Sequence, residues 1–158
     1  MARQIRRSSL EGAGNKKHPD PSSQGWMIRP GKISTLVGPF WERRVGGNVQ
    51  IGIVCDPRHD NGKGKMHGGL LMTLADMGMG AVIRSTGDDV QCVTVQLDVA
   101  FLQAVDIGDF VTTECHIQHR TSGTIFVSGT LKTGEKAVAS AQGVFKSLAN
   151  VGLAWQGG

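Results

Sequence analysis

The chain lacks the features that mark a membrane-spanning or secreted protein. It contains no run of 18 uncharged apolar residues, about the minimum for a transmembrane helix. Its basic opening, MARQIRRSSL, is not followed by the apolar stretch of a secretory signal. We therefore expect a cytoplasmic protein without membrane association.

Cysteine is scarce as well. The three cysteines, Cys55, Cys92 and Cys115, are odd in number and lie in apolar, strand-like segments. This pattern favours reduced, buried thiols over a disulfide framework. The cysteines make no recognised zinc spacing with His59 or His67, and we expect no bound metal.

Several signatures of enzyme and binding classes are also missing. There is no P-loop, no dinucleotide-binding fingerprint and no G-x-S-x-G elbow.

His116 and His119, three apart on an expected strand, should point to opposite faces and so make a poor metal pair. The formal charge of +4 does not indicate nucleic acid, because residues 1–25 hold five basic and two acidic side chains while the rest is nearly neutral, with twelve and eleven.

Two regions are expected along the chain. Residues 1–25 are polar, rich in Gly, Pro and Ser and without periodicity, which predicts a flexible basic arm, and residues 26–158 suit a single domain. Strand-like segments on short turns predict antiparallel pairing, with one helix from about Gly68 to Arg84. The sequence therefore predicts an α+β fold. The strand-like segments are residues 33–45, 48–55, 91–101, 110–120, 124–132 and 136–148.

The predicted helix, GGLLMTLADMGMGAVIR, is apolar on almost every face. Such a helix is buried all round, and because one sheet covers only one side of it, a second subunit is the simplest cover for the other. Gly78 and Gly80 each lower helix propensity by roughly 1 kcal/mol, which predicts close packing against a neighbouring backbone.

Asp76 is the single acid between Asp60 and Asp88 and lies within this apolar helix. A carboxylate in such surroundings loses hydration at considerable cost unless it is paired, protonated or in a wet cleft. We interpret Asp76 as a nucleophile or general base. The alternative is a helix residue that points to solvent or bonds to a neighbouring chain.

His67, Gly68 and Gly69 lie where the helix begins. Free N–H groups and the positive end of the helix dipole favour negative charge there, and Gly68 has no Cβ to block an approaching carbonyl. This is the chemistry of an oxyanion hole for acyl transfer, with Gly69 as an adjacent substrate contact. The pattern also fits plain loop geometry, and His67 is either a further participant or an ordinary loop histidine.

The spacing of Gly68 and Asp76 decides the assembly. Eight residues separate them, which is about 12 Å along one helix. Each group must lie within roughly 3–3.5 Å of the atom it serves. One helix cannot bring these positions together, but two antiparallel copies can, so we expect a twofold homodimer with two composite sites.

Four other residues are weaker candidates. Asn61 either orients a water or a carbonyl, or is a turn asparagine. Lys63 and Lys65 either contact ligand phosphates or simply solvate their loop. Thr94 could bond to Asp76 or to a water, although strict alternation along its strand places the apolar neighbours, rather than Thr94, toward the helix.

The segment from Asn61 through His67-Gly68-Gly69 to TLAD at 73–76 resembles the hotdog-fold acyl-CoA thioesterases of the phenylacetate-pathway type. The stretch VTVQLDVAFLQAV, with Gly-Asp at 108–109, is similar to that family's strand after the helix, and the resemblance covers about residues 33–148. It implies a curved antiparallel sheet around one long helix, paired into homodimers and often into dimers of dimers.

The resemblance also implies roles for the candidates. The substrate would be an acyl- or aryl-CoA thioester at the dimer interface, hydrolysed to CoA and free acid with no cofactor besides the CoA it carries. Gly68 would supply the oxyanion N–H, and Asp76 of the partner chain the nucleophile or general base. Asn61 would hold the water or carbonyl with support from His67, and Thr94 falls where the family has a small hydroxyl residue near the acid.

Two other functions are compatible with such a dimer. One is a non-catalytic acyl-CoA-binding protein, since function is grafted on a fold rather than dictated by it. The other is a hydratase or dehydratase, which would pair a histidine with an acid in a different arrangement. No such histidine-led helix motif occurs here, so we rank this option last.

Overall fold

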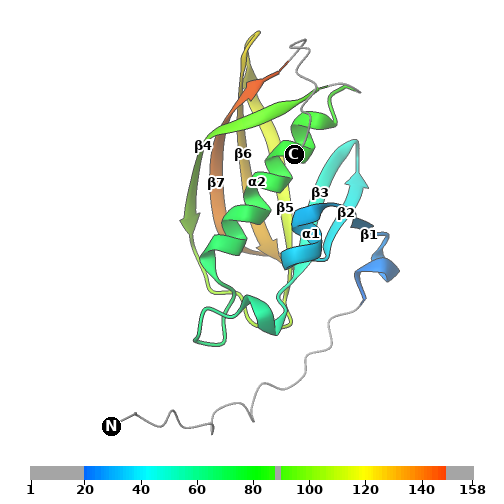
Figure 1. Cartoon of the computed structure of the whole chain (residues 1–158), viewed down its shortest axis with the longest axis vertical. Helices are drawn as coiled ribbons and strands as arrows, with labels where there is room; N and C mark the ends of the chain where they lie inside the picture. The colour runs from blue at the N-terminus through cyan, green and yellow to red at the C-terminus, as the bar shows by residue number, and fades with distance from the viewer. Residues whose placement is uncertain (1–19, 88–89, 149–158) are drawn as a thin grey trace, which may run out of the picture.

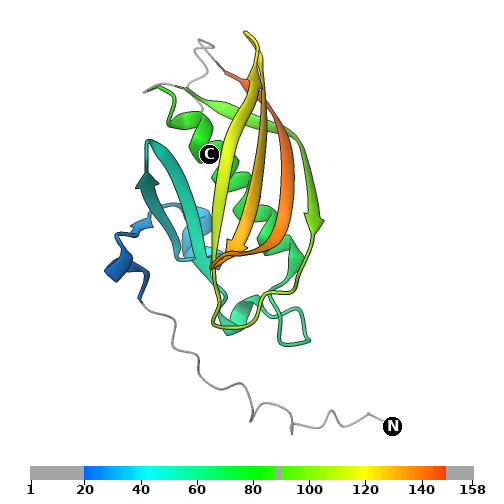
Figure 2. The same cartoon turned by 180° about the vertical axis from the view of Figure 1, so that it is seen from behind.

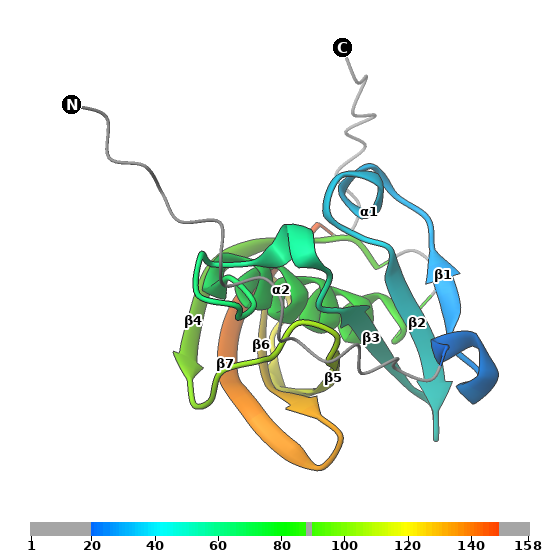
Figure 3. The ribbon, with the colours of Figure 1, turned by 90° about the horizontal axis from the view of Figure 1, so that it is seen from below.

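A computed structural model describes residues 20–87 and 90–148. Within these residues one antiparallel sheet of seven strands curves around a single long helix, α2 (Gly68–Arg84), which confirms the predicted α+β class (Figures 1 and 3). The helix has the bounds expected from the sequence. Across the sheet the strands are β1 (Met27–Arg29), β2 (Phe40–Val45), β3 (Asn48–Val54), β5 (Phe110–Arg120), β6 (Thr124–Thr133), β7 (Lys136–Ser147) and β4 (Cys92–Phe101).

The core lies between α2 and the concave face of the sheet. Helix α2 contacts β3, β4, β5, β6 and β7, and the view from behind shows β5, β6 and β7 crossing in front of the helix (Figure 2). Leu74 and Met79 of α2 and Ile125 and Phe145 of the sheet are almost completely buried there. Burial of large apolar side chains stabilises such a layer by roughly 1.5–3 kcal/mol each.

Gly78 explains how closely α2 approaches the sheet. A Cβ built on Gly78 would lie 2.6–2.8 Å from three side-chain atoms of Thr113 in β5. The Thr113 hydroxyl is itself buried and accepts a hydrogen bond from the Ile51 N–H at 3.0 Å. Gly78 therefore packs closely as expected, but against a side chain rather than a backbone, whereas a Cβ on Gly80 would meet the guanidinium of Arg84.

The sheet covers more of α2 than we expected. The curved sheet buries both flanks of the helix within one chain, so a second subunit is not required to cover a whole face. Met72 is the one large apolar side chain of α2 that is exposed, at 38%. What remains open is a narrow strip that includes Gly69, Met72 and the half-buried Thr73 and Asp76.

Bulges in two strands overturn expectations from strict alternation. The register of β4 against β7 shifts between Thr94 and Gln96, so Val95 is an extra residue and Thr94 lies opposite the core residue Phe145, on the face toward the helix. The expectation that Thr94 faces away from the helix was therefore wrong.

A similar shift occurs in β5. Its register against β6 changes between Ile117 and His119, which places His116 opposite Ser128 and His119 opposite Phe126. Residues 126 and 128 share one face of β6, so the two histidines lie on the same face rather than on opposite faces. The His116 ring bonds to the Ser128 hydroxyl at 3.0 Å, and the His119 ring lies 6.2 Å from the Phe126 ring.

The segment 33–45 is only partly a strand. Its first half forms helix α1 (Lys32–Val37), and β2 begins at Phe40. The Thr35 hydroxyl donates to the Gly31 carbonyl, and the Ser34 hydroxyl accepts from the Phe40 N–H, local bonds that compete with strand pairing. The helix buries none of its residues.

The N-terminal boundary stays a prediction, because residues 1–19 lie outside the described part of the chain. The end of the expected arm forms a short 3₁₀ helix, η1 (Pro21–Gln24), capped by the Asp20 carboxylate. Trp26 follows it and is buried against Phe110, with the Arg43 guanidinium over its ring. Among the described helices, none has the length and apolar character needed to cross a membrane.

Candidate active site

The loop before α2 is fixed by backbone hydrogen bonds. The Met66 N–H donates to the Val105 carbonyl at 2.9 Å, and the His67 N–H donates to the His59 carbonyl at 2.7 Å. His67 is the N-cap of the helix, and its Nδ1 accepts the Gly69 N–H at 3.0 Å. His67 therefore orders the first turn of the helix and occupies the N–H of Gly69.

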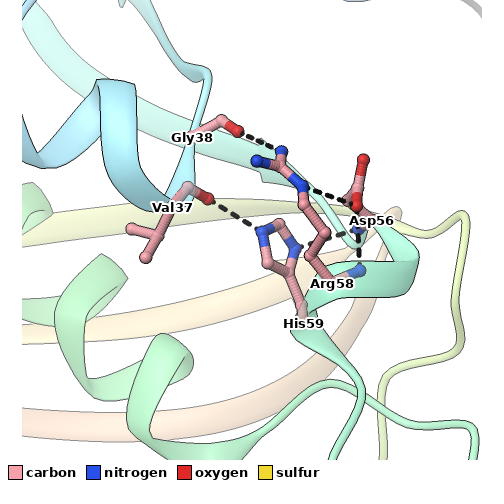
Figure 4. A network of polar contacts seen from close by, with 5 residues as sticks. All are labelled: Val37, Gly38, Asp56, Arg58 and His59. Carbon is pink, nitrogen blue, oxygen red and sulfur yellow. Dashed lines mark hydrogen bonds and ion pairs between the residues drawn. The ribbon is translucent and has the colours of Figure 1, made fainter.

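A second set of hydrogen bonds, made by His59 and Arg58, fixes the segment that precedes this loop. His59, at the end of the 3₁₀ helix η2 (Pro57–His59), is buried; its Nδ1 accepts from the Asp56 N–H at 2.9 Å and its Nε2 donates to the Val37 carbonyl at 2.8 Å (Figure 4). Arg58 bridges the Asp56 carboxylate and the Gly38 carbonyl. The Arg58 N–H bonded to Asp56 also lowers the pKa of that carboxyl.

Gly68 is the first residue of α2, and its N–H has no acceptor among the described residues. Free N–H groups are expected at a helix start, where the dipole adds a partial positive charge. The residue borders a hollow of about 340 Å³ that Asn61, Leu71 and Phe101 also line. The arrangement can therefore accept a carbonyl oxygen or another anionic oxygen.

Asp76 lies two turns further along α2 and is held by β4. The Thr94 hydroxyl donates to Asp76 Oδ1 at 2.6 Å, a short, charge-assisted hydrogen bond. The carboxylate is half-buried, and the hydroxyl fixes one of its two oxygens. A carboxylate held in this way can take a proton from water or attack a carbonyl carbon.

The other candidates lie in the loop at the helix start. The Asn61 side-chain oxygen accepts the Lys63 N–H at 2.9 Å, so the residue shapes its own turn while also lining the hollow. The Lys63 side chain is exposed. The Lys65 ammonium forms an ion pair with Asp106, and this hydrogen bond raises the pKa of Lys65.

The structure thus gathers the predicted residues into two groups, one around the start of α2 and one two turns along it. Asn61, Lys65 and Gly68 border the hollow at its start, whereas Asp76 and Thr94 lie about 12 Å further along the axis. The two groups do not meet within one chain.

Sequence reasoning did not place two residues near the helix start. Phe101 borders the hollow, and His59 supports the loop from a buried position. From the sequence, Phe101 could be named as a contributor to the shape of an acyl pocket, but its position beside Gly68 could not be predicted. His59 carried a faint signal, as a histidine shortly before the glycine-rich loop.

The three cysteines show no sign of activation as nucleophiles. All three cysteines are free, and burial raises the pKa of both Cys55 and Cys115 to about 12 and also raises that of Cys92. Such thiols stay protonated and weakly nucleophilic near neutral pH. Over residues 20–87 and 90–148 no cluster of three or more His, Cys, Asp or Glu side chains is arranged to hold a metal ion.

Comparisons with known proteins identify the class. The seven-stranded sheet wrapped around one helix is a hotdog fold. A family model described as the thioesterase superfamily matches residues 63–140, which include the end of the loop before α2, α2 itself, β4, β5 and β6. A Pseudomonas aeruginosa protein named provisionally as an esterase, PA0474, is 34% identical over 121 residues, covering 75% of this chain and 90% of that protein. The chain belongs to the thioesterase superfamily.

Solved structures agree with this assignment. Conserved protein PA5202 from Pseudomonas aeruginosa is 30% identical with a TM-score of 0.69, over 75% of this chain and 95% of that one. The protein smu.793 from Streptococcus mutans, solved bound to acetyl CoA, is 26% identical with a TM-score of 0.64, over 70% of this chain and 90% of that one.

Proposed function

We propose that this protein hydrolyses acyl-CoA thioesters at a site formed by two copies of the chain. The observation that carries the proposal is the pair of groups on α2: a helix-start N–H at Gly68 with no described acceptor, and a carboxylate at Asp76 fixed by the Thr94 hydroxyl. One is suited to a developing oxyanion, the other to a nucleophile or base. Membership of the thioesterase superfamily and the CoA-bound relative support this reaction.

The pairing of two helices follows from the spacing of these groups. If Gly68 of one copy meets Asp76 of the other in an antiparallel pair, the twofold axis passes at the residue midway between them, which is Met72. Met72 is the exposed large apolar residue of α2. Strand β4 supports the same contact, because it is paired on one side only in the described sheet and exposes Val93 and Val95.

The chemistry then has two possible courses. As a general base, Asp76 takes a proton from water while the oxygen attacks the thioester carbonyl; the carbon–sulfur bond breaks, and the thiolate of CoA leaves and takes up a proton. As a nucleophile, Asp76 displaces the thiolate and forms a mixed anhydride, which water then hydrolyses to the free acid. In both courses the carbonyl oxygen gains negative charge opposite the Gly68 N–H.

The role of Asp76 is tested by replacing it with asparagine, which keeps its shape and its contact with Thr94. CoA release is measured with linear and aryl acyl-CoAs for the wild type and Asp76→Asn. We expect the rate to fall by at least about 100-fold, because a catalytic base or nucleophile is lost. If the wild type releases no CoA from any thioester but binds acyl-CoA as tightly as the variant, the protein is a non-catalytic acyl-CoA-binding protein instead.

Finer assignments rest on this proposal. The phenylacetate-pathway type stays a prediction, which turnover of phenylacetyl-CoA relative to linear acyl-CoAs tests. Lys63 and Lys65 are proposed to contact the phosphates of CoA, and Lys65 would have to exchange Asp106 for a phosphate. Gly69 is proposed as an adjacent contact, and a dimer of dimers as the larger assembly.

A further inference from the structure

The hollow beside Gly68 is lined mostly by apolar side chains, and the hydrolysis mechanism alone does not explain this lining. Its volume of about 340 Å³ is within the usual range of small ligand pockets. Its walls are apolar and its polar groups are few, which suits an acyl group better than a phosphate. The apolar walls come from Met66, Leu71, Phe101, Leu102, Ala104 and Val105, and the polar groups from Asn61, Lys65 and Gln103.

Phe101 is the side chain that lies nearest a Cβ built on Gly68. A Cβ built on Gly68 would lie 3.2, 3.4 and 3.7 Å from three atoms at the tip of the Phe101 ring. The strand ends at Phe101, and the next two N–H groups both donate to the Val138 carbonyl, at 2.9 and 3.2 Å. The backbone that carries the ring is therefore fixed.

The ring is unusually exposed for a side chain on the helix-facing side of the sheet. Phe101 lies opposite the buried Ala139 of β7, yet 53% of its surface is accessible, whereas Leu97 and Val99 on the same face are partly buried against the core. Exposed aromatic surface that borders an apolar hollow marks a place for a ligand.

The position of the ring determines which part of a substrate it contacts. A carbonyl oxygen bonded to the Gly68 N–H lies about 2.9 Å from that nitrogen. The first carbons of the acyl chain are attached to the same carbonyl, so a ring that borders Gly68 is within their reach for van der Waals contact at roughly 3.5–4.0 Å. A branch at the carbon next to the carbonyl would need the space that the ring fills.

We propose that Phe101 sets the specificity of the site by excluding acyl groups that are branched next to the thioester carbonyl. The inference rests on the proposed function and adds the residue that selects among acyl-CoA substrates. A straight chain lies along the ring, whereas a branched one meets it. Well-packed pockets discriminate single methyl groups by about 10- to 200-fold.

The test compares butyryl-CoA with isobutyryl-CoA, two isomers of which only the second is branched at the carbon next to the thioester carbonyl. We expect the wild type to prefer butyryl-CoA in kcat/KM, and Phe101→Ala to raise the isobutyryl-to-butyryl ratio by about 10-fold. Phe101→Leu keeps an apolar wall and should give an intermediate ratio. Phe126→Ala is the matched control, because Phe126 is also an exposed strand phenylalanine but lies away from the hollow, and it should leave the ratio unchanged.

Calorimetric binding of the same two ligands to Asp76→Asn, with and without Phe101→Ala, separates this inference from the proposed function. A shift in the ratio of dissociation constants without any wild-type turnover would support selection by Phe101 in a protein that only binds. Clear turnover with a ratio that stays within about twofold in Phe101→Ala would overturn the inference while the hydrolase stands. A monomeric Phe101→Ala protein would also overturn it, because the ring would then be an interface residue.

Discussion

The two sides of α2 carry different kinds of information. The inner side, represented by Leu74 and Gly78, is buried against the sheet and is defined by packing alone. The outer stripe, which we define as Gly68, Met72 and Asp76, has one of these residues at every fourth position. It carries an N–H with no acceptor in the described part of the chain, an exposed thioether and a fixed carboxylate. One helix thus separates stability from chemistry, so substitutions on its two sides should have separate consequences.

The largest effect on activity after loss of Asp76 should come from removing the Gly68 N–H. Gly68→Pro deletes that donor at the first position of the helix, where proline is well tolerated. We expect kcat to fall by about 100-fold, as for the loss of one oxyanion donor, with little change in the denaturation midpoint.

Gly68→Ala is the matched control, since it adds a Cβ near Phe101 but keeps the N–H. The kcat of Gly68→Ala should fall by less than about 10-fold. Equal losses in both variants would show that bulk near Phe101 matters and that the N–H does not.

A smaller effect on activity should follow from removing the hydroxyl that holds the Asp76 carboxylate. Thr94→Val keeps the shape of the side chain and removes the hydroxyl that donates to Asp76. We expect kcat to fall by about 10-fold, roughly the worth of one charge-assisted hydrogen bond, while Thr94→Ser retains most activity. Wild-type kcat in Thr94→Val would rule out a positioning role for the hydroxyl.

Substitutions on the inner side of α2 should change the stability of the protein. Gly78→Ala forces a Cβ onto Thr113, whose hydroxyl accepts a buried hydrogen bond, and we expect the free energy of unfolding to fall by about 1–3 kcal/mol in urea denaturation. Gly80→Ala meets only the flexible guanidinium of Arg84 and should gain about 0.5–1 kcal/mol from helix propensity. Equal changes at both positions would contradict the packing difference.

Much of the fold and of the candidate site could be predicted from the sequence, because the same physical cause sets both the sequence pattern and the structure there. The helix bounds follow from the glycines at its start and the apolar run after them, and the sheet from alternating strands on short turns. The two candidate groups, Gly68 and Asp76, stood out because a glycine-rich helix start and a lone acid conflict with simple packing.

What could not be predicted depends on local irregularities and on contacts distant in the sequence. The extra residue Val95 reverses which side of β4 faces the helix, and no periodicity reveals a bulge. Helix α1 replaced part of an expected strand because the Ser34 and Thr35 hydroxyls bond locally. The contact between Phe101 and Gly68 joins residues far apart in the chain and required the folded sheet.

The most direct test of the central claim is complementation between two inactive chains. Asp76→Asn and Gly68→Pro protomers are co-expressed with different affinity tags, and the heterodimer is purified through both tags. If each site combines Gly68 of one copy with Asp76 of the other, one of the two sites is intact, and the heterodimer should show about half of the wild-type CoA release. A heterodimer no more active than the two variants alone would contradict the account, because it would place both groups of each site in a single chain.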